Sequence, residues 1–83
     1  MNREAARIDL QKADLRLQNE QKKFNRASEF RKQQTITEAE YDEAVLAVGI
    51  AEADHKMAEL ELERAEATLR AAQATPASVP PAK

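Results

Sequence analysis

The sequence YDEAVLAVGIAEADHKMAELELERAEATLRAA, residues 41–72, decides the fold of this chain. Two rows of positions, each with a spacing of seven, run through it without a break. One row holds only alanine, at positions 44, 51, 58, 65 and 72, and the other holds Tyr41, Val48, His55, Leu62 and Leu69. A heptad of this kind predicts one long α-helix whose seam faces a partner helix. Because alanine adds no bulk, the backbone of that partner can come close.

The partner is expected in the same chain, because residues 2–34 show a second heptad pattern. One row holds Leu10, Leu17 and Phe24, and the other holds alanine at positions 6, 13 and 27, with Glu20 between them. Neither glycine nor proline interrupts this stretch. An isolated helix with so narrow an apolar stripe is only marginally stable, so it needs a surface to pack against.

The two patterns are separated by a short break, for which we predict a turn at residues 35–37. Thr37 fits the N-cap of the second helix, and Glu40 completes a capping box of the form Thr-x-x-Glu. Ile36 before the cap and Tyr41 after it can form a hydrophobic staple. These signals predict a second helix over residues 38–73. A connection this short makes the two helices antiparallel neighbours.

The predicted fold is therefore all-α, an antiparallel two-helix coiled-coil hairpin over residues 1–73. The heptads predict that Phe24 faces Val48 and that Leu17 faces His55, with the alanine rows in the same register. Residues 74–83 contain Pro76, Pro80 and Pro81, and we expect a flexible, disordered Pro-rich tail there. A polyproline ligand is not favoured, because the tail has no P-x-x-P motif.

Composition excludes several classes of function. The chain has 83 residues, 34% of them charged, no cysteine and one glycine, which is typical of long helices rather than of a globular core. It contains no nucleophile paired with a base and no glycine-rich phosphate loop, so we expect no enzyme activity, no cofactor and no small-molecule substrate. No apolar run approaches the ~20 residues that a membrane span needs. The first residues do not resemble a signal peptide.

The charges are distributed unevenly. Residues 1–34 hold nine Lys or Arg and five Asp or Glu, a net charge of +4, whereas residues 35–83 hold four and ten, a net charge of −6. A basic half could bind nucleic acid, but its basic residues alternate with acids and lack interleaved aromatics. We favour two complementary helices lying side by side, and no nucleic-acid partner.

The only histidine, His55, falls in the predicted seam. The register places Glu20 and Glu59 near it, so the sequence allows a weak metal site. Metal sites in proteins usually have more ligands than this, and further contacts hold those ligands in place. We therefore interpret His55 as a polar seam residue that helps to set the register, with no metal bound.

The turn end is the candidate binding site, with Arg26, Phe30, Ile36 and Thr37 as its residues. Phe30 lies off the two seam rows, so we expect its ring to be partly exposed. An exposed aromatic ring beside an arginine at the end of a long hairpin is a plausible contact surface for a partner protein.

Residues 36–44, ITEAEYDEA, resemble the segment that follows the turn in the α-hairpin of periplasmic adaptor proteins, also called membrane fusion proteins, of bacterial tripartite efflux and secretion systems. The resemblance extends over about residues 3–72. Adaptor hairpins of this family, which includes haemolysin-secretion-D-like proteins, often carry Arg-x3-Leu-x6-Ser at the tip. Here Arg26, Phe30 and Thr37 have that spacing, with Phe in place of Leu and Thr in place of Ser. The family usually has glycine just before the isoleucine, where this chain has Gln34 and Thr35.

The resemblance implies a structural spacer in the periplasm whose tip docks with an outer-membrane channel. Arg26 would donate hydrogen bonds, Phe30 would be an apolar knob, and Thr37 would serve as both cap and contact. It also implies contacts with neighbouring hairpins of the same protein, and with an inner-membrane transporter through lipoyl-like and β-barrel segments outside this chain. The alternative is a generic antiparallel coiled coil that associates with itself through a second apolar strip, which comprises Leu46, Ala53, Leu60 and Ala67.

Overall fold

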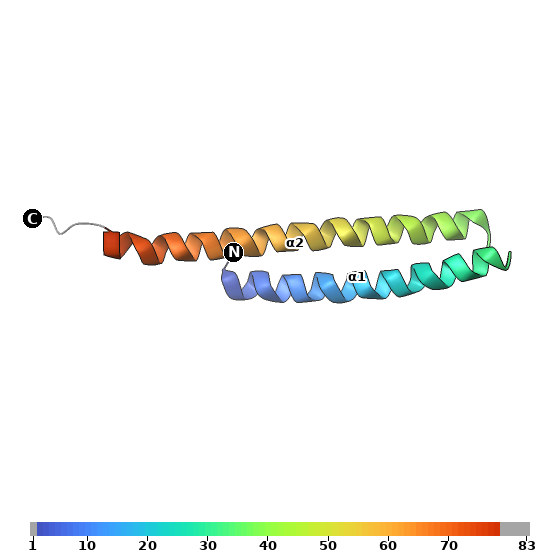
Figure 1. Ribbon diagram of the computed structural model, residues 1–83, viewed down its shortest axis with the longest axis horizontal. Helices are drawn as coiled ribbons and strands as arrows, with labels where there is room; N and C mark the ends of the chain where they lie inside the picture. The colour runs from blue at the N-terminus through green and yellow to red at the C-terminus, as the bar shows by residue number, and fades with distance from the viewer. Residues whose placement is uncertain (1, 79–83) are drawn as a thin grey trace, which may run out of the picture.

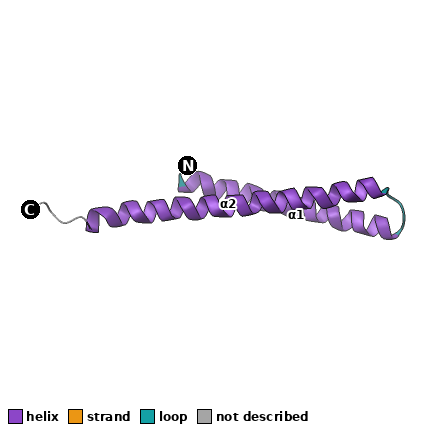
Figure 2. Ribbon diagram, turned by 90° about the horizontal axis from the view of Figure 1, so that it is seen from above, coloured by secondary structure: helices purple, strands orange, loops and turns teal. Residues whose placement is uncertain are grey.

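Two long helices joined by a short turn make up the described part of the chain. The computed structural model describes residues 2–78. Helix α1 spans Arg3–Lys32 and helix α2 spans Glu38–Ser78. The helices lie side by side and run in opposite directions (Figure 1). Seen from above they cross at a shallow angle (Figure 2), as packed helices with heptad seams do. The predicted antiparallel all-α hairpin is confirmed.

The seam between the helices is built on alanine. Among the residues whose side chains the structure describes, the buried hydrophobic ones are all alanines, at positions 6, 51, 58 and 65, with exposed fractions between 0% and 9%. Larger members of the predicted rows, such as Leu17, Phe24 and Leu62, are half-buried at its edges. The small side chains let the two backbones approach, and they also leave the hairpin with a thin core.

Charged pairs across the seam join the basic helix to the acidic one, as the uneven charge distribution predicts. The Arg3 Nε lies 3.7 Å from the Glu66 Oε2, and the Arg16 Nη1 lies 4.0 Å from the Asp54 Oδ2. All four side chains are well exposed, so each pair contributes only about 0–1 kcal/mol to stability. Their main value is that they fix how α1 lies along α2.

The contacts between the helices agree with the predicted register. Arg31 lies over the Tyr41 ring, and these two residues continue the facing pairs Leu17–His55 and Phe24–Val48 by one heptad. Ala6 and Ala65, which face each other in the predicted alanine rows, are both buried. The Phe24 ring also packs against Tyr41, and His55 contacts Asp14, one turn before the predicted Leu17. Helix α1 ends at Lys32, two residues before its predicted end.

The helix boundaries were predicted less well than the helices. Asn2 is the N-cap of α1 rather than its first residue, because its Oδ1 accepts a hydrogen bond from the Ala5 N–H at 2.7 Å. The predicted end of α2 at residue 73 is wrong, since the helix continues through Pro76 to Ser78. Alanines at 71, 72, 74 and 77 are strong helix formers, and Pro76 removes only one backbone hydrogen bond near the helix end. The rest of the predicted tail, residues 79–83, lies outside the described residues.

Candidate docking surface at the turn

Helix α1 ends in a hydrogen-bonded cap that sets the shape of the turn. The Thr35 N–H donates to the Phe30 carbonyl at 2.8 Å, and the Gln34 N–H donates to the Arg31 carbonyl at 2.9 Å. These two bonds form a Schellman motif, in which the residue after the C-cap takes the left-handed conformation. That residue is Gln34, with φ of 59°. The Thr35 hydroxyl adds a second bond to the Phe30 carbonyl, at 3.0 Å.

Helix α2 begins with the predicted capping box. The Glu40 N–H donates to the Thr37 Oγ1 at 3.0 Å, and the Thr37 N–H donates to the Glu40 Oε1 at 2.8 Å. The Thr37 hydroxyl also donates to the same carboxylate oxygen at 3.2 Å. The N-cap role of Thr37 is thus confirmed. Its role as a contact for a partner stays a prediction, and its hydroxyl proton is already engaged within the chain.

Three of the four predicted site residues come together beside this turn. Arg26, Phe30 and Ile36 line an open groove of about 280 Å³, together with Lys23, Ala27 and Glu40. The α1 residues recur at spacings of three and four, so they share one helix face, and Ile36 closes the groove from the turn. Thr37 lies next to the groove in sequence but is not part of its lining.

The groove combines apolar and charged side chains. The Phe30 side chain is 44% exposed, which leaves much of its ring open to solvent. Arg26 forms no ion pair within residues 2–78, whereas the Lys23 Nζ lies 3.8 Å from the Glu20 Oε2. The Oε1 of Glu40 accepts two bonds from Thr37. Among the cations of the groove, the guanidinium of Arg26 is therefore the one without an ion pair in the described residues.

Sequence reasoning missed Lys23 and Glu40 as part of this surface. The signal was available for Lys23, because residues 23, 26, 27 and 30 follow the helical spacing that puts side chains on one face. Behind the groove, Phe24 and Tyr41 pack with ring centres 5.8 Å apart, and Arg31 lies over the Tyr41 ring. These contacts fasten the two helix ends to each other and so hold the groove in place.

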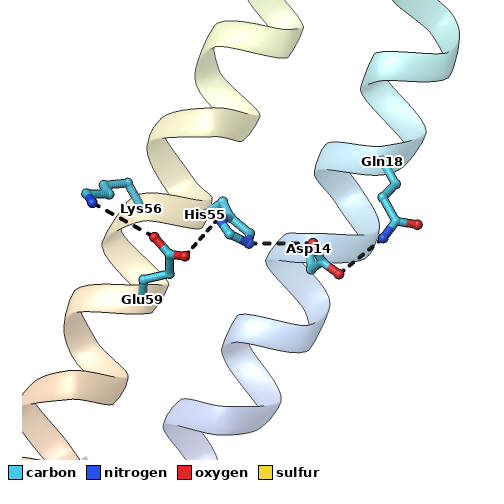
Figure 3. Close-up of polar contacts among 5 residues, drawn as sticks. All are labelled: Asp14, Gln18, His55, Lys56 and Glu59. Carbon is cyan, nitrogen blue, oxygen red and sulfur yellow. Dashed lines mark hydrogen bonds and ion pairs between the residues drawn. The ribbon is translucent and has the colours of Figure 1, made fainter.

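The predicted seam histidine belongs to a separate polar cluster, halfway along the hairpin. The His55 Nε2 lies 3.5 Å from the Asp14 Oδ1 on α1, and its Nδ1 lies 3.9 Å from the Glu59 Oε2 on α2 (Figure 3). Gln18 in turn donates to the Asp14 Oδ2 at 3.1 Å. The two carboxylates contact different ring nitrogens, so they do not converge on one point.

Glu20, the third ligand considered for a metal site, is not part of the histidine cluster. Its Oε2 lies 3.8 Å from the Lys23 Nζ, on α1 itself. Within the described residues, no three His, Cys, Asp or Glu side chains are grouped so that they could hold a metal ion. His55 instead links the two helices through Asp14, a partner that the sequence analysis did not name.

Comparisons with protein-family models, with curated proteins and with solved structures find no match to this chain. The resemblance to adaptor hairpins consequently rests on residues 26–44 and on the hairpin shape. Neither described helix contains a stretch that is long and apolar enough to span a membrane.

Proposed function

We propose that this chain is a helical spacer whose turn end docks end-on with a helical partner protein, in the way that adaptor hairpins dock with an outer-membrane channel. The observation that carries the proposal is the meeting of Arg26, Phe30 and Ile36 in one open groove at the end of the hairpin.

The chemistry of the groove fits the end of another helix. The last carbonyl groups of a helix have no partners within it, and they accept hydrogen bonds from cationic side chains. The unpaired guanidinium of Arg26 can supply several such donors. The exposed ring of Phe30, with Ile36 beside it, can take up an apolar side chain next to those carbonyls. A partner whose helices end in a turn offers both features at once.

The shape of the hairpin supports a spacer. Helix α2 has 41 residues, and at 1.5 Å per residue it is about 60 Å long. The turn lies at one extreme of this length, and the start of α1 and the end of α2 lie toward the other (Figure 1). We place the chain in the periplasm, in contact with neighbouring hairpins, with a link to an inner-membrane transporter through segments outside this chain.

Site-specific crosslinking in living cells tests the docking directly. A photoreactive amino acid replaces Phe30, and the matched control carries the same amino acid at Leu15, which is 65% exposed on the middle of α1. We expect Phe30 to give a crosslink to one outer-membrane protein, identified by mass spectrometry, and Leu15 to give none. Equal crosslinking at both positions, or a crosslink only to cytoplasmic proteins, contradicts the proposal.

A charge reversal distinguishes the effect of the Arg26 guanidinium from the effect of the net charge of α1. Arg26→Asp should reduce the crosslink from position 30 about tenfold or more, since it removes the donor and introduces repulsion toward carbonyl groups. Lys22→Asp makes the same change of charge one turn away, at an exposed residue outside the groove, and should leave the crosslink intact. Equal losses from both variants would show that only the net charge matters.

A further inference from the structure

A second apolar surface runs along the solvent-exposed side of α2. Most of it faces away from α1, and Met57 lies at its flank, where it also lines a cavity with residues of α1. The surface consists of Leu46, Ile50, Ala53, Met57 and Leu60, which we call the outer stripe. Its four large side chains are between 41% and 62% exposed. The residues are spaced alternately by four and three, which is itself a heptad pattern. Helical geometry places them roughly opposite the buried alanines of the seam.

The outer stripe holds bulkier side chains than the seam does. The residues buried between α1 and α2 are alanines, whereas leucine, isoleucine and methionine face solvent. A helix with apolar residues on two opposite sides is typical of an inner helix with a neighbour on each side. Helix α1 is one of these neighbours. The structure leaves the other side of α2 uncovered.

Gly49 gives a separate indication that a backbone approaches this face. It lies inside α2, next to Ile50, and a Cβ placed on it would meet nothing within 4 Å. Glycine is unfavourable in a helix interior compared with alanine, and no contact in the described chain requires it here. A missing side chain at the edge of the outer stripe lets another helix come closer than it otherwise could.

The charges along the edges of the outer stripe fit a second copy of the same chain. Lys56 and Glu63 lie on one edge, seven residues apart. When two copies pair antiparallel with Met57 opposite Leu60 of the second copy, Lys56 comes opposite Glu63 of the second copy, and the two-fold symmetry repeats this pair. Within its own chain, the Lys56 Nζ lies 4.0 Å from the Glu59 Oε1, and its side chain is 72% exposed. On the other edge, Asp54 and Glu61 are each paired with an arginine of their own chain, at 4.0 and 3.5 Å.

The parallel arrangement is disfavoured by Arg64, which continues the heptad of the outer stripe. Parallel pairing would place this arginine against its own copy, whereas the antiparallel register places it opposite Ala53 of the second copy. Like charges facing each other in a helix pair are destabilising. We propose that the chain forms an antiparallel dimer through the outer stripe, with α2 packed against α2 and each α1 on the outside. This dimer goes beyond the proposed docking, because it uses another face of the hairpin and places the two turns at opposite ends.

Sedimentation over a wide range of concentration tests the dimer. The unaltered chain should pass from monomer to dimer, and Met57→Lys should weaken the association about tenfold or more while the helical circular dichroism is kept. Ile8→Lys is the matched control, because Ile8 is an exposed apolar residue on α1 outside the outer stripe, and it should change nothing. A chain that is monomeric at every concentration, or a dimer unaffected by Met57→Lys, overturns the proposal.

Charge exchange tests the antiparallel register. Lys56→Glu and Glu63→Lys should each weaken the dimer, and the two changes together should restore it. A double variant no tighter than the single ones overturns this register. These measurements do not depend on the turn, so the crosslink from position 30 can succeed or fail independently of them.

Discussion

The guanidinium carbon of Arg31 lies 4.4 Å from the centre of the Tyr41 ring, and this contact joins the last turn of α1 to the beginning of α2. The same ring packs against Phe24, with the ring centres 5.8 Å apart and the ring planes tilted by 43°. In a hairpin whose buried side chains are alanines, this cluster is the largest set of packed side chains near the turn. It holds the two helix ends at a fixed separation.

Removing the Tyr41 ring should therefore destabilise the hairpin from its turn end. We expect Tyr41→Ala to lower the free energy of unfolding by about 2–3 kcal/mol, from the lost aromatic pair, the lost cation–π contact and the exposed apolar area. Tyr41→Phe keeps a ring in place and should cost less than about 1 kcal/mol. Urea unfolding followed by circular dichroism measures both. A loss as large for Tyr41→Phe as for Tyr41→Ala would locate the effect in the hydroxyl group instead.

Gln34 offers a change in the opposite direction. Its φ of 59° is strained for a residue with a Cβ, and glycine is the preferred residue at this position of a Schellman motif. Gln34→Gly should raise the free energy of unfolding by about 0.5–1 kcal/mol, after the entropy that glycine adds to the unfolded chain is taken into account.

The neighbouring residue provides the control for that change. Gln33 has a φ of −86°, which any residue adopts without strain, so Gln33→Gly relieves no strain and should lower stability by a few tenths of a kcal/mol or more. Thermal unfolding of the two variants side by side separates the effect of conformation from the effect of losing a glutamine. Stabilisation by both variants would contradict the explanation.

The heptads and the capping box predicted the hairpin because both are local signals with a direct geometric meaning. Ala51, Ala58 and Ala65 are buried as their spacing requires, and Thr37 and Glu40 form the predicted pair of bonds. The end of α1 was harder to predict, because its cap depends on a glutamine in a conformation that usually indicates glycine. A sequence rule based on residue type places no turn at Gln34.

The candidate site was predicted in part for a similar reason. Arg26 and Phe30 are four residues apart on one face of a helix, so their closeness to each other follows from the sequence spacing. The meeting of Ile36 with that face depends on the path of the turn, which spacing does not describe. Asp14 was missed as the partner of His55 because the heptad names the residue that faces the ring, whereas a polar side chain one turn away can also reach it.

The capping box should contribute measurably to the stability of α2. Thr37→Ala removes an oxygen that accepts the Glu40 N–H bond, and we expect a loss of about 1 kcal/mol in the free energy of unfolding. Thr37→Ser keeps the oxygen and should retain most of that stability. Hydrogen exchange at the first amides of α2 gives a local measurement. Unchanged protection in Thr37→Ala would show that packing alone fixes the start of the helix.

Replacing His55 by leucine should stabilise the hairpin. The position lies in the seam row between Val48 and Leu62, and the histidine side chain is 23% exposed there. Its two carboxylate contacts, at 3.5 and 3.9 Å, involve the well-exposed groups of Asp14 and Glu59, so together they contribute little to stability. A leucine would add apolar burial, and we expect a net gain of about 1 kcal/mol in the free energy of unfolding.

The reverse exchange at the neighbouring seam position is the control for His55→Leu. Leu62→His places a polar ring where no comparable cross-helix carboxylate contact is found among the described residues, and it should lower stability by about 1–2 kcal/mol. Asp14→Asn keeps the shape of the partner on α1 while removing its charge, and it should change stability by less than about 0.5 kcal/mol. His55→Leu and Asp14→Asn could instead lower the free energy of unfolding by equal amounts. Only a strong pair across the helices would produce two equal losses, and the contact between His55 and Asp14 would then be a principal link between the helices.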